Sequence, residues 1–258
     1  MEEPLKVSRE DIAALIRDKY QGNAPDEALA VDITRLIDGE PLAYVIGWIP
    51  FLSLRIRLDS RPLIPRPETE YWTNELLTHL REKFGTQPFR LLDLCAGSGA
   101  IGLAVLKEFP EAHVYFADLM PEHVAQIELN IQENNLDASR VEICGSDLFN
   151  SFPSSWTEPF DVIATNPPYI PEDRTLDKSV TNFEPLEALF SGSSGLSVIT
   201  RIAQEAPMRL TPEGELWIEC DIENIGTAKT LLDAYGAQHS DIRTDQYGRP
   251  RFVVSYYP

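Results

Sequence analysis

The stretch Asp93-Leu94-Cys95-Ala96-Gly97-Ser98-Gly99 closes a run of apolar residues and precedes a helical pattern at about 100–108. Glycines at such a strand-to-helix turn let the backbone approach a ligand closely and leave the helix N-terminus accessible. With Gly102, they also form the pattern GxGxxG, which is the fingerprint of dinucleotide-binding folds. Because purely structural turns share this pattern, it indicates a nucleotide site only where the surrounding sequence agrees.

From this turn onward, apolar strands alternate with helical stretches. We predict strands at 90–95, 113–119, 141–147, 160–166 and 214–220, and helices at about 100–108, 121–135, 195–210 and 223–235. Such an alternation is typical of a parallel sheet that is covered on both faces. The chain ends differently, because QHSDIRT and RFVVSYY flank the turn DQYGRP and predict an antiparallel hairpin. The predicted fold class is α/β, with a Rossmann-like, seven-stranded sheet that ends in this hairpin.

The sequence before residue 88 predicts a small helical region and a linker. Ser8 and Asp11 form a capping-box pattern at the start of an amphipathic helix at 8–20, and residues 26–38 predict a second helix. Short alternating segments at 47–65 are typical of a β-hairpin, and residues 68–84 are helical again. We therefore divide the chain into a helical, substrate-recognising region (1–45), a β-hairpin with a linker helix (46–87) and the main domain (88–258).

Acidic residues close three successive predicted strands. Asp118 ends the second strand, where a carboxylate can bind ribose hydroxyls, and Asp147 ends the third, within reach of an adenine amino group. An NAD site would share both features. Asp93 favours S-adenosylmethionine (AdoMet) instead, because a carboxylate before the glycines would repel a pyrophosphate but suits the ammonium group of methionine. A single such acid could equally cap a helix or turn, but three of them indicate an AdoMet site.

The fourth predicted strand runs into Asn166-Pro167-Pro168-Tyr169. The two prolines end the strand and have no N–H to donate, so backbone carbonyls can face a cavity as acceptors. The Asn166 side-chain oxygen and the Pro167 carbonyl can then accept both hydrogens of a substrate –NH₂, while Tyr169 packs on the planar group that carries it. Two acceptors orient the nitrogen lone pair and stabilise its developing charge. Unless it is only a proline-rich turn, the tetrapeptide predicts methylation of a planar nitrogen, with Asn166, Pro167 and Tyr169 as catalytic residues.

The composition bears on the partners of this site. The formal net charge is −19, and no cluster of Lys and Arg forms the basic stripe that is usual in proteins that bind duplex nucleic acid. No apolar run approaches the ~20 residues needed to cross a bilayer, and the N-terminus lacks the apolar segment of a secretory signal. We expect a soluble intracellular protein, in the cytoplasm or the mitochondrial matrix, with no membrane partner and no direct contact with nucleic acid.

The cysteines and histidines do not indicate a disulfide framework or a metal site. Cys95, Cys144 and Cys220 cannot all pair, and they lie in or beside predicted buried strands, where reduced core thiols are expected. The four histidines lie far apart and form neither HxxxH nor HExxH. We therefore expect no metal.

With these motifs in place, the sequence resembles the HemK/PrmC-type methyltransferases. These are class I AdoMet-dependent enzymes that modify the glutamine of the Gly-Gly-Gln motif in class I peptide chain release factors. The resemblance extends from about Gly39 to the C-terminus. It rests above all on two long, specific segments, Gly39-Glu40-Pro41-Leu42-Ala43-Tyr44-Val45-Ile46-Gly47 and Leu63-Ile64-Pro65-Arg66-Pro67-Glu68-Thr69-Glu70. The Asn-Pro-Pro-Tyr tetrapeptide counts for less, since DNA adenine and rRNA guanine methyltransferases also carry it.

The resemblance implies N5-methylation of a glutamine side chain, with AdoMet as cofactor and S-adenosylhomocysteine as product. The expected cofactor-binding residues are Asp93, Cys95, Ala96, Gly97, Ser98, Gly99, Asp118, Asp147, Leu148 and Asn166. The expected substrate-binding residues are Arg66, Glu68, Asn166, Pro167, Pro168 and Tyr169. The chain departs from the family where Cys95 replaces a glycine and where Leu148 replaces a frequent aromatic residue, which leaves adenine stacking to Phe149 or weakens it. It also carries Glu219-Cys220-Asp221 where Glu-Ile-Gly is usual.

Three alternatives stay open on the sequence alone. A nucleic-acid amino-methyltransferase could use the same clamp on adenine N6 or guanine N2, although the net charge and the two family segments favour a release factor. A non-catalytic AdoMet-binding partner would have no need of the intact tetrapeptide, and an NAD(P)-dependent oxidoreductase would share the glycine motif. Our prediction is a monomeric AdoMet-dependent methyltransferase whose protein substrate is a class I release factor.

Overall fold

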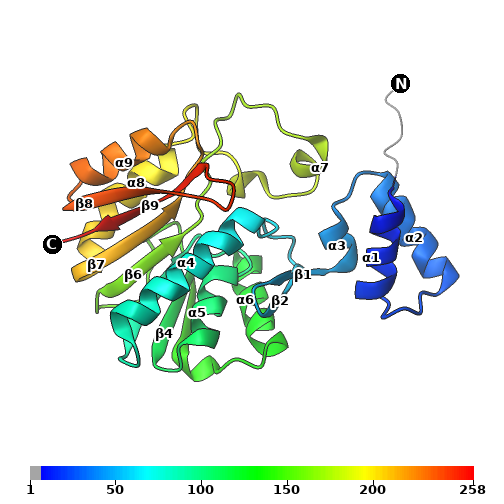
Figure 1. Cartoon of the computed structure of the whole chain (residues 1–258), viewed down its shortest axis with the longest axis horizontal. Coiled ribbons are helices and arrows are strands. Elements are labelled where there is room, and N and C mark those ends of the chain that lie inside the picture. Colours follow the sequence, from blue (N-terminus) through cyan, green and yellow to red (C-terminus); the bar gives the residue numbers. More distant parts are fainter. Residues whose placement is uncertain (1–6) are drawn as a thin grey trace.

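The computed structural model describes residues 7–258, so the first six residues of the predicted N-terminal region lie outside the described residues. A seven-stranded sheet with the order β5-β4-β3-β6-β7-β9-β8 forms the centre of the molecule (Figure 1). Its strands are β3 (Phe89–Leu94), β4 (Ala112–Asp118), β5 (Val141–Gly145), β6 (Phe160–Thr165), β7 (Leu210–Glu219), β8 (His239–Thr244) and β9 (Pro250–Tyr256). Strands β3 to β7 are parallel, and β9 is antiparallel to β7 and β8. The predicted fold class, including its C-terminal hairpin, is confirmed.

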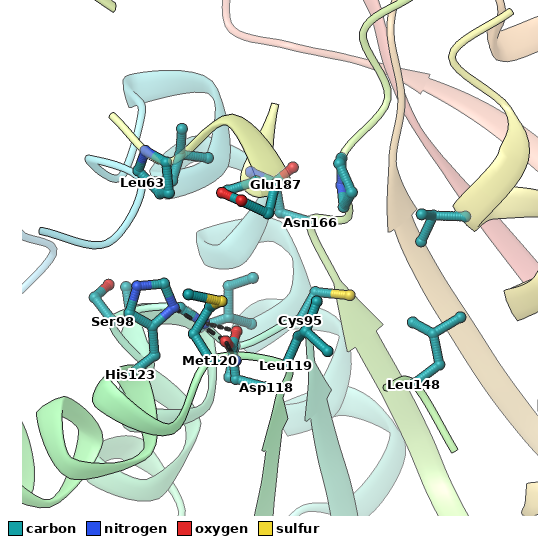
Figure 2. A pocket seen from close by; sticks show the side chains of 18 of the residues that line it. Leu63, Cys95, Ser98, Asp118, Leu119, Met120, His123, Leu148, Asn166 and Glu187 are labelled. Carbon is teal, nitrogen blue, oxygen red and sulfur yellow. Dashed lines mark hydrogen bonds and ion pairs between the residues drawn. The ribbon is translucent and has the colours of Figure 1, made fainter. Parts of the chain in front are cut away.

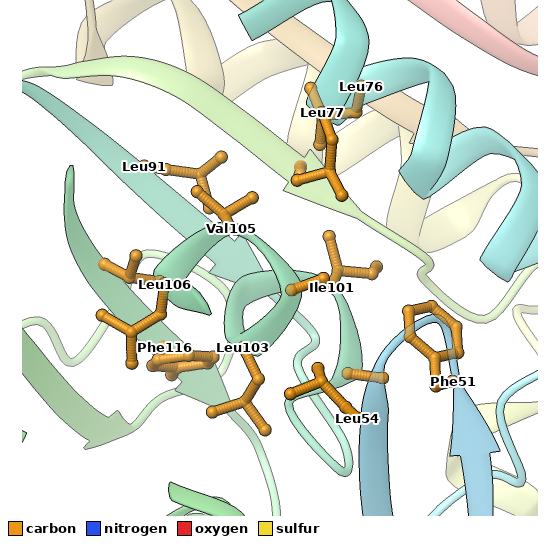
Figure 3. Packing of buried hydrophobic residues seen from close by; sticks show 14 of the residues in the cluster. Phe51, Leu54, Leu76, Leu77, Leu91, Ile101, Leu103, Val105, Leu106 and Phe116 are labelled. Carbon is orange, nitrogen blue, oxygen red and sulfur yellow. The ribbon is translucent and has the colours of Figure 1, made fainter. Parts of the chain in front are cut away.

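Helices cover both faces of this sheet because alternate residues of each strand point to opposite sides. Leu91 and Trp217 pack with α4 (Pro67–Phe84), α5 (Ala100–Glu108) and α6 (Pro121–Glu133), whereas their neighbours Leu92 and Ile218 pack with α8 (Ser197–Glu205) and α9 (Ile225–Ala234). Figure 3 shows Ile101 of α5 between the sheet and a hairpin of the preceding chain. The sequence before the main domain therefore contributes to the main core.

This hairpin and three helices make up the N-terminal part of the chain. The hairpin pairs β1 (Trp48–Phe51) with β2 (Leu54–Arg57), and helices α1 (Arg9–Asp18), α2 (Asp26–Ile37) and α3 (Leu42–Ile46) lie beyond it (Figure 1). Leu15, Leu36 and Val45 form a small separate core among these helices. The predicted capping box of Ser8 and Asp11 is confirmed, with the Asp11 N–H donating to the Ser8 hydroxyl at 3.0 Å.

Three amide side chains of α6 and its C-cap fasten the hairpin to the main domain. Gln126, Asn130 and the C-cap residue Asn134 are spaced by four residues, so they lie on one face of the helix. They accept the backbone N–H groups of Arg55 and Arg57 in β2 and of Ser60 shortly after it, at 2.7–2.9 Å. Asn130 also donates to the backbone carbonyl of Ser98, at 2.9 Å. The position of the hairpin is therefore coupled to the glycine turn.

The structure differs from the predicted elements at the end of one helix, at the start of one strand and in two short helices. The helix expected at 195–210 ends at Glu205, because Pro207 removes the N–H that a continuing helix needs, and β7 begins at Leu210 rather than at residue 214. Two short helices, α3 and α7 (Lys178–Thr181), were not predicted, since one helical turn is too short to show a period.

Across residues 7–258, no helix is both long enough and apolar enough to span a bilayer.

Candidate active site

A cavity opens at the carboxyl ends of the parallel strands, where the chain connections diverge. From β3 the chain continues to β4 and β5 on one side, and β6 and β7 lie on the other. Ligands of open α/β sheets bind at such a switch point. Figure 2 shows Asn166 and Glu187 on one side of the cavity and Asp118, Met120 and His123 on the other. Nine residues of the predicted site line it: Cys95, Ala96, Gly97, Ser98, Asp118, Asp147, Leu148, Asn166 and Pro168.

The glycine turn at the floor of this cavity is fixed by backbone hydrogen bonds. The Ala96 N–H donates to the Ala117 carbonyl of β4 at 3.1 Å, and the Gly99 N–H donates to the Ala96 carbonyl at 2.7 Å. Cys95, Gly97 and Gly99 all have positive φ, of 58°, 54° and 80°. A side chain in this conformation costs roughly 1–3 kcal/mol, so Cys95 is a strained position where glycine would fit better.

Asp118 holds this turn against β4. Its Oδ2 accepts the Gly97 N–H at 2.7 Å, and its Oδ1 accepts the Met120 N–H at 2.9 Å. Oδ1 also forms a hydrogen bond with His123 Nδ1 at 3.0 Å (Figure 2). An ionised carboxylate has about four acceptor positions, so one remains for a ligand. His123 also lines the cavity and was not predicted, because its role depends on the helix that brings it back over Asp118.

Asp147 stands at the rim of the cavity in a bidentate ion pair. Arg201 of α8 donates to Asp147 Oδ1 at 2.8 Å and to Oδ2 at 2.9 Å, and both residues line the cavity. Hydrogen bonding to Arg201 lowers the pKa of Asp147 below its usual value. Leu148 lines the cavity, whereas Phe149 is buried and packs edge-on against Phe152, so the expectation that Phe149 takes over adenine stacking is wrong.

Asp93 lies beneath the turn rather than in the cavity wall. It is fully buried, and its Oδ2 accepts the N–H of Gly102 in α5 at 2.8 Å. Burial raises the pKa of Asp93 well above its usual value. Asp93 therefore anchors α5 directly behind the glycine turn. Two further residues that were expected at the site, Gly99 and Pro167, do not line this cavity either.

The tetrapeptide begins immediately after β6, and its first residue lines two cavities. Asn166 faces the cavity described above and also a second, smaller one. Tyr169 and Arg66 line only the second cavity, as do Ile170, Leu176, Val180 and Leu189, whereas Leu63 and Ala188 line both. Pro168 lines the first cavity and Pro167 is buried. Asn166 therefore lies between the first cavity and the second.

Behind the tetrapeptide lies a network of buried polar groups. The Glu219 carboxylate accepts hydrogen bonds from the Thr69 hydroxyl and Trp72 Nε1, both at 2.7 Å, and from the Tyr169 hydroxyl at 2.9 Å. The Asn166 Nδ2 donates to Thr69 Oγ1 at 3.1 Å. Glu219 was noted in the sequence as part of an unusual segment, but its role was missed because its partners come from α4 and the tetrapeptide.

The two predicted residues of the linker have different surroundings. Arg66 lines the second cavity and forms an ion pair with the buried carboxylate of Glu184 at 2.5 Å, while Glu184 also accepts the Ile64 N–H at 3.0 Å. These two contacts of Glu184 join the linker to the part of the chain that follows α7. Glu68 lines neither cavity and instead pairs with Arg249 of the C-terminal hairpin, at 2.8 Å.

The thiols and acids of the described chain are not arranged as a metal site. Cys95, Cys144 and Cys220 are free thiols, and burial raises the pKa of each one; Cys144 and Cys220 lie in the core, whereas Cys95 lines the cavity. No group of three or more His, Cys, Asp or Glu side chains within residues 7–258 is placed to hold a metal ion.

Comparison with known proteins points in the same direction as this geometry. Residues 68–183 match the family model of the "Methyltransferase small domain". The release factor glutamine methyltransferase of Rhodopirellula baltica is 34% identical over 219 residues, which cover 82% of this chain and 73% of the relative. That of Deinococcus radiodurans is 35% identical over 243 residues, or 93% of this chain and 84% of the relative.

A solved structure with the same fold is the 16S rRNA N2 methyltransferase of T. thermophilus in complex with AdoMet and guanosine. It superposes with a TM-score of 0.56 over 82% of this chain and 50% of that chain, at 17% sequence identity. At this identity the likeness concerns the fold alone.

Proposed function

Since the chain belongs to the release factor glutamine methyltransferase family, and is therefore an AdoMet-dependent methyltransferase, we propose that it methylates a glutamine side chain in a class I peptide chain release factor. The acceptor atom is the amide nitrogen, N5, of the glutamine in the Gly-Gly-Gln motif. The observation that carries this proposal is the position of Asn166 between the two cavities. The methyl donor belongs on one side of this residue and the amide on the other.

The first cavity suits AdoMet, the cofactor of this methyltransferase class. Asp118 keeps one free acceptor position for a ribose hydroxyl, and Asp147 lies at the rim, where an adenine amino group can reach it. We assign the turn from Cys95 to Gly99 to the methionine end and Leu148 to the adenine ring. When bound, AdoMet supplies a methyl group on a positively charged sulfur, which keeps the electron pair of the broken carbon–sulfur bond.

The residues of the chain orient the amide and stabilise its charge. Asn166, which lines both cavities, accepts one N–H group of the glutamine through Oδ1. We assign the other N–H group to the backbone carbonyl of Pro167, although this residue lines neither cavity, and the two bonds turn the nitrogen lone pair toward the first cavity. The nitrogen becomes positive as it bonds to the methyl carbon, and both acceptors favour this charge. One N–H proton then passes to solvent, which leaves an N-methyl amide. Because attack precedes proton loss, no strong base is required.

The second cavity is suited to a peptide. Its lining is mostly apolar, and Tyr169 and Arg66 provide an aromatic face and a positive charge. We propose that the residues next to the glutamine lie here and that α1–α3 contact the body of the release factor. The net charge of −19 matches a basic, ribosome-binding substrate and disfavours direct contact with nucleic acid. We further propose that the enzyme is an intracellular monomer, which sedimentation can test.

Mass spectrometry of a purified class I release factor after incubation with enzyme and AdoMet tests the proposal. We expect a gain of one methyl group on the peptide that contains Gly-Gly-Gln. A release factor with asparagine in place of that glutamine should remain unmodified. Asn166→Ala should reduce the rate by at least about 10²-fold, because it removes one of the two acceptors. Methylation of DNA or RNA but not of the release factor would reject the proposal.

A further inference from the structure

We infer that Thr69 and Glu219 are positioning residues that hold the Asn166 amide with its oxygen toward the substrate. The inference rests on the proposed function, in which Asn166 must present an acceptor. An asparagine side chain has an oxygen and an NH₂ group of nearly equal size, so shape alone does not decide which one faces the cavity. The reverse orientation would present N–H groups to the N–H groups of the glutamine. Something in the protein must therefore select the orientation.

The Thr69 hydroxyl makes this selection because it has a single proton. That proton is donated to Glu219 Oε2 at 2.7 Å, so only lone pairs of Thr69 Oγ1 remain to face Asn166. Lone pairs accept only from the NH₂ end of the amide, and Asn166 Nδ2 lies 3.1 Å away. Asn166 Oδ1 is then the atom left for the substrate.

Three donors converge on the Glu219 carboxylate, so it accepts the hydrogen bond from Thr69; burial raises the pKa of Glu219, and these hydrogen bonds oppose that rise. Its Oε2 also accepts from Trp72 Nε1 at 2.7 Å, and an indole N–H can only donate. Thr69 and Glu219 are both buried, with relative exposures of 3% and 1%, and Thr69 also borders the first cavity beside Asn166. The direction of the hydrogen-bond chain Glu219–Thr69–Asn166 is therefore set at its buried end.

The Glu219 carboxylate also fixes the side chain of Tyr169, the last residue of the tetrapeptide. Glu219 Oε1 accepts the Tyr169 hydroxyl at 2.9 Å, which leaves the ring of Tyr169 in the wall of the second cavity. One buried acid of β7 thus orients both Asn166 and Tyr169. Glu219 could instead serve only to tie α4 to β7, and the bond from Trp72 would be enough for that. The positioning role differs from this structural role because it requires the Thr69 hydroxyl to orient Asn166.

Thr69→Val, Thr69→Ser and Thr73→Val separate these roles. Thr73 lies one helical turn beyond Thr69, is fully buried, and donates its hydroxyl to the Thr69 carbonyl at 2.7 Å, so Thr73→Val is a matched loss of one buried hydroxyl. We expect Thr69→Val to lower kcat for the release factor at least about tenfold, and Thr69→Ser to restore it to within about threefold. Thr73→Val should stay near wild type. Equal rates for Thr69→Val and Thr73→Val would overturn the inference.

A spectroscopic measurement tests the orientation without any substrate. In protein labelled with ¹⁵N-asparagine, the side-chain NH₂ signal of Asn166 is identified by its loss in Asn166→Ala. We expect this signal to shift in Thr69→Val and to stay in place in Thr69→Ser and Thr73→Val. An unshifted signal in Thr69→Val would overturn the inference. If wild-type enzyme does not methylate the release factor, the proposed function fails, while this measurement still decides whether Thr69 holds Asn166.

Discussion

Arg201 binds the carboxylate of Asp147 through both terminal nitrogens, at 2.8 and 2.9 Å, at the rim of the cavity assigned to AdoMet. The pair joins α8 to the segment after β5, and it holds the carboxylate in one orientation. Both side chains are partly exposed, at 38% and 49%, so the pair contributes little to overall stability. Its effect should appear instead in the binding of the adenine end of the cofactor.

We predict that Arg201→Ala weakens AdoMet binding by about 5- to 20-fold, because the freed Asp147 carboxylate loses its fixed orientation. The melting temperature should change by only a few degrees. Calorimetric titration with AdoMet measures the affinity. The control is Lys229→Ala, which breaks another exposed ion pair, with Asp233 on α9, away from the cavity. An unchanged affinity in Arg201→Ala would show that the pair plays no part in cofactor binding.

Gly102→Ala should destabilise the protein by roughly 1–3 kcal/mol, because α5 packs too closely on β4 to admit a methyl group. A Cβ at this position would lie 2.4 Å from Phe116 Cε1 and 3.0 Å from Asp93 Cβ. Urea denaturation measures the free energy of unfolding. Gly226→Ala on α9 is the control, since nothing lies within 4 Å of its Cβ position, and it should leave stability unchanged or raise it by up to about 1 kcal/mol. Similar values for the two variants would contradict this account of α5.

The third prediction concerns Glu215, a buried carboxylate on β7. Burial alone would raise the pKa of Glu215, but hydrogen bonds from His79, Lys83 and Trp217 outweigh it and lower the pKa to about 2, from an ordinary value of 4.5. A pKa that is lower in the folded state stabilises the protein above the unfolded-state value, and this stabilisation is lost as the pH falls from about 4.5 toward 2.

Glu215→Gln should therefore be less stable than wild type by a few kcal/mol at pH 7, and the difference should shrink as the pH falls below about 4.5. Denaturant unfolding of both proteins between pH 7 and pH 3.5 measures this difference. Glu213→Gln is a suitable control, because Glu213 is exposed on the same strand and its side chain has no part in the cluster. A difference between Glu215→Gln and wild type that stays constant over this range would contradict the role assigned to Glu215.

The order of strands and helices in the main domain could be predicted because each element has its own local signal. Buried strands such as β3 are mostly apolar, and turn-forming residues such as Pro88 and Gly97 lie beyond its ends. Once the strands were predicted, the acids at their ends could be placed in one cavity, because the carboxyl ends of parallel strands meet at the same edge of the sheet. Asp118 and Asp147 line the cavity as this topology requires.

The residues that the sequence did not reveal depend on contacts between distant segments. Arg201 lies 54 positions after Asp147, and Glu219 lies 150 positions after Thr69. No local pattern connects such pairs, because only the packing of α8 and α4 on the sheet brings them together. For Asp93, the sequence indicated its position near the end of a strand but not the direction of its side chain. The side chain points toward α5 rather than into the cavity, and this direction depends on the turn that follows.

The central claim is tested most directly by identifying the methylated amino acid itself. A class I release factor is incubated with the enzyme and AdoMet carrying a ¹³C-methyl group, digested to free amino acids with peptidases so that the amide survives, and analysed by mass spectrometry against synthetic N5-methylglutamine. The account predicts that the label appears as N5-methylglutamine and that it is absent with Asn166→Ala. Label in any other amino acid, or none in a release factor that the enzyme demonstrably binds, would contradict it.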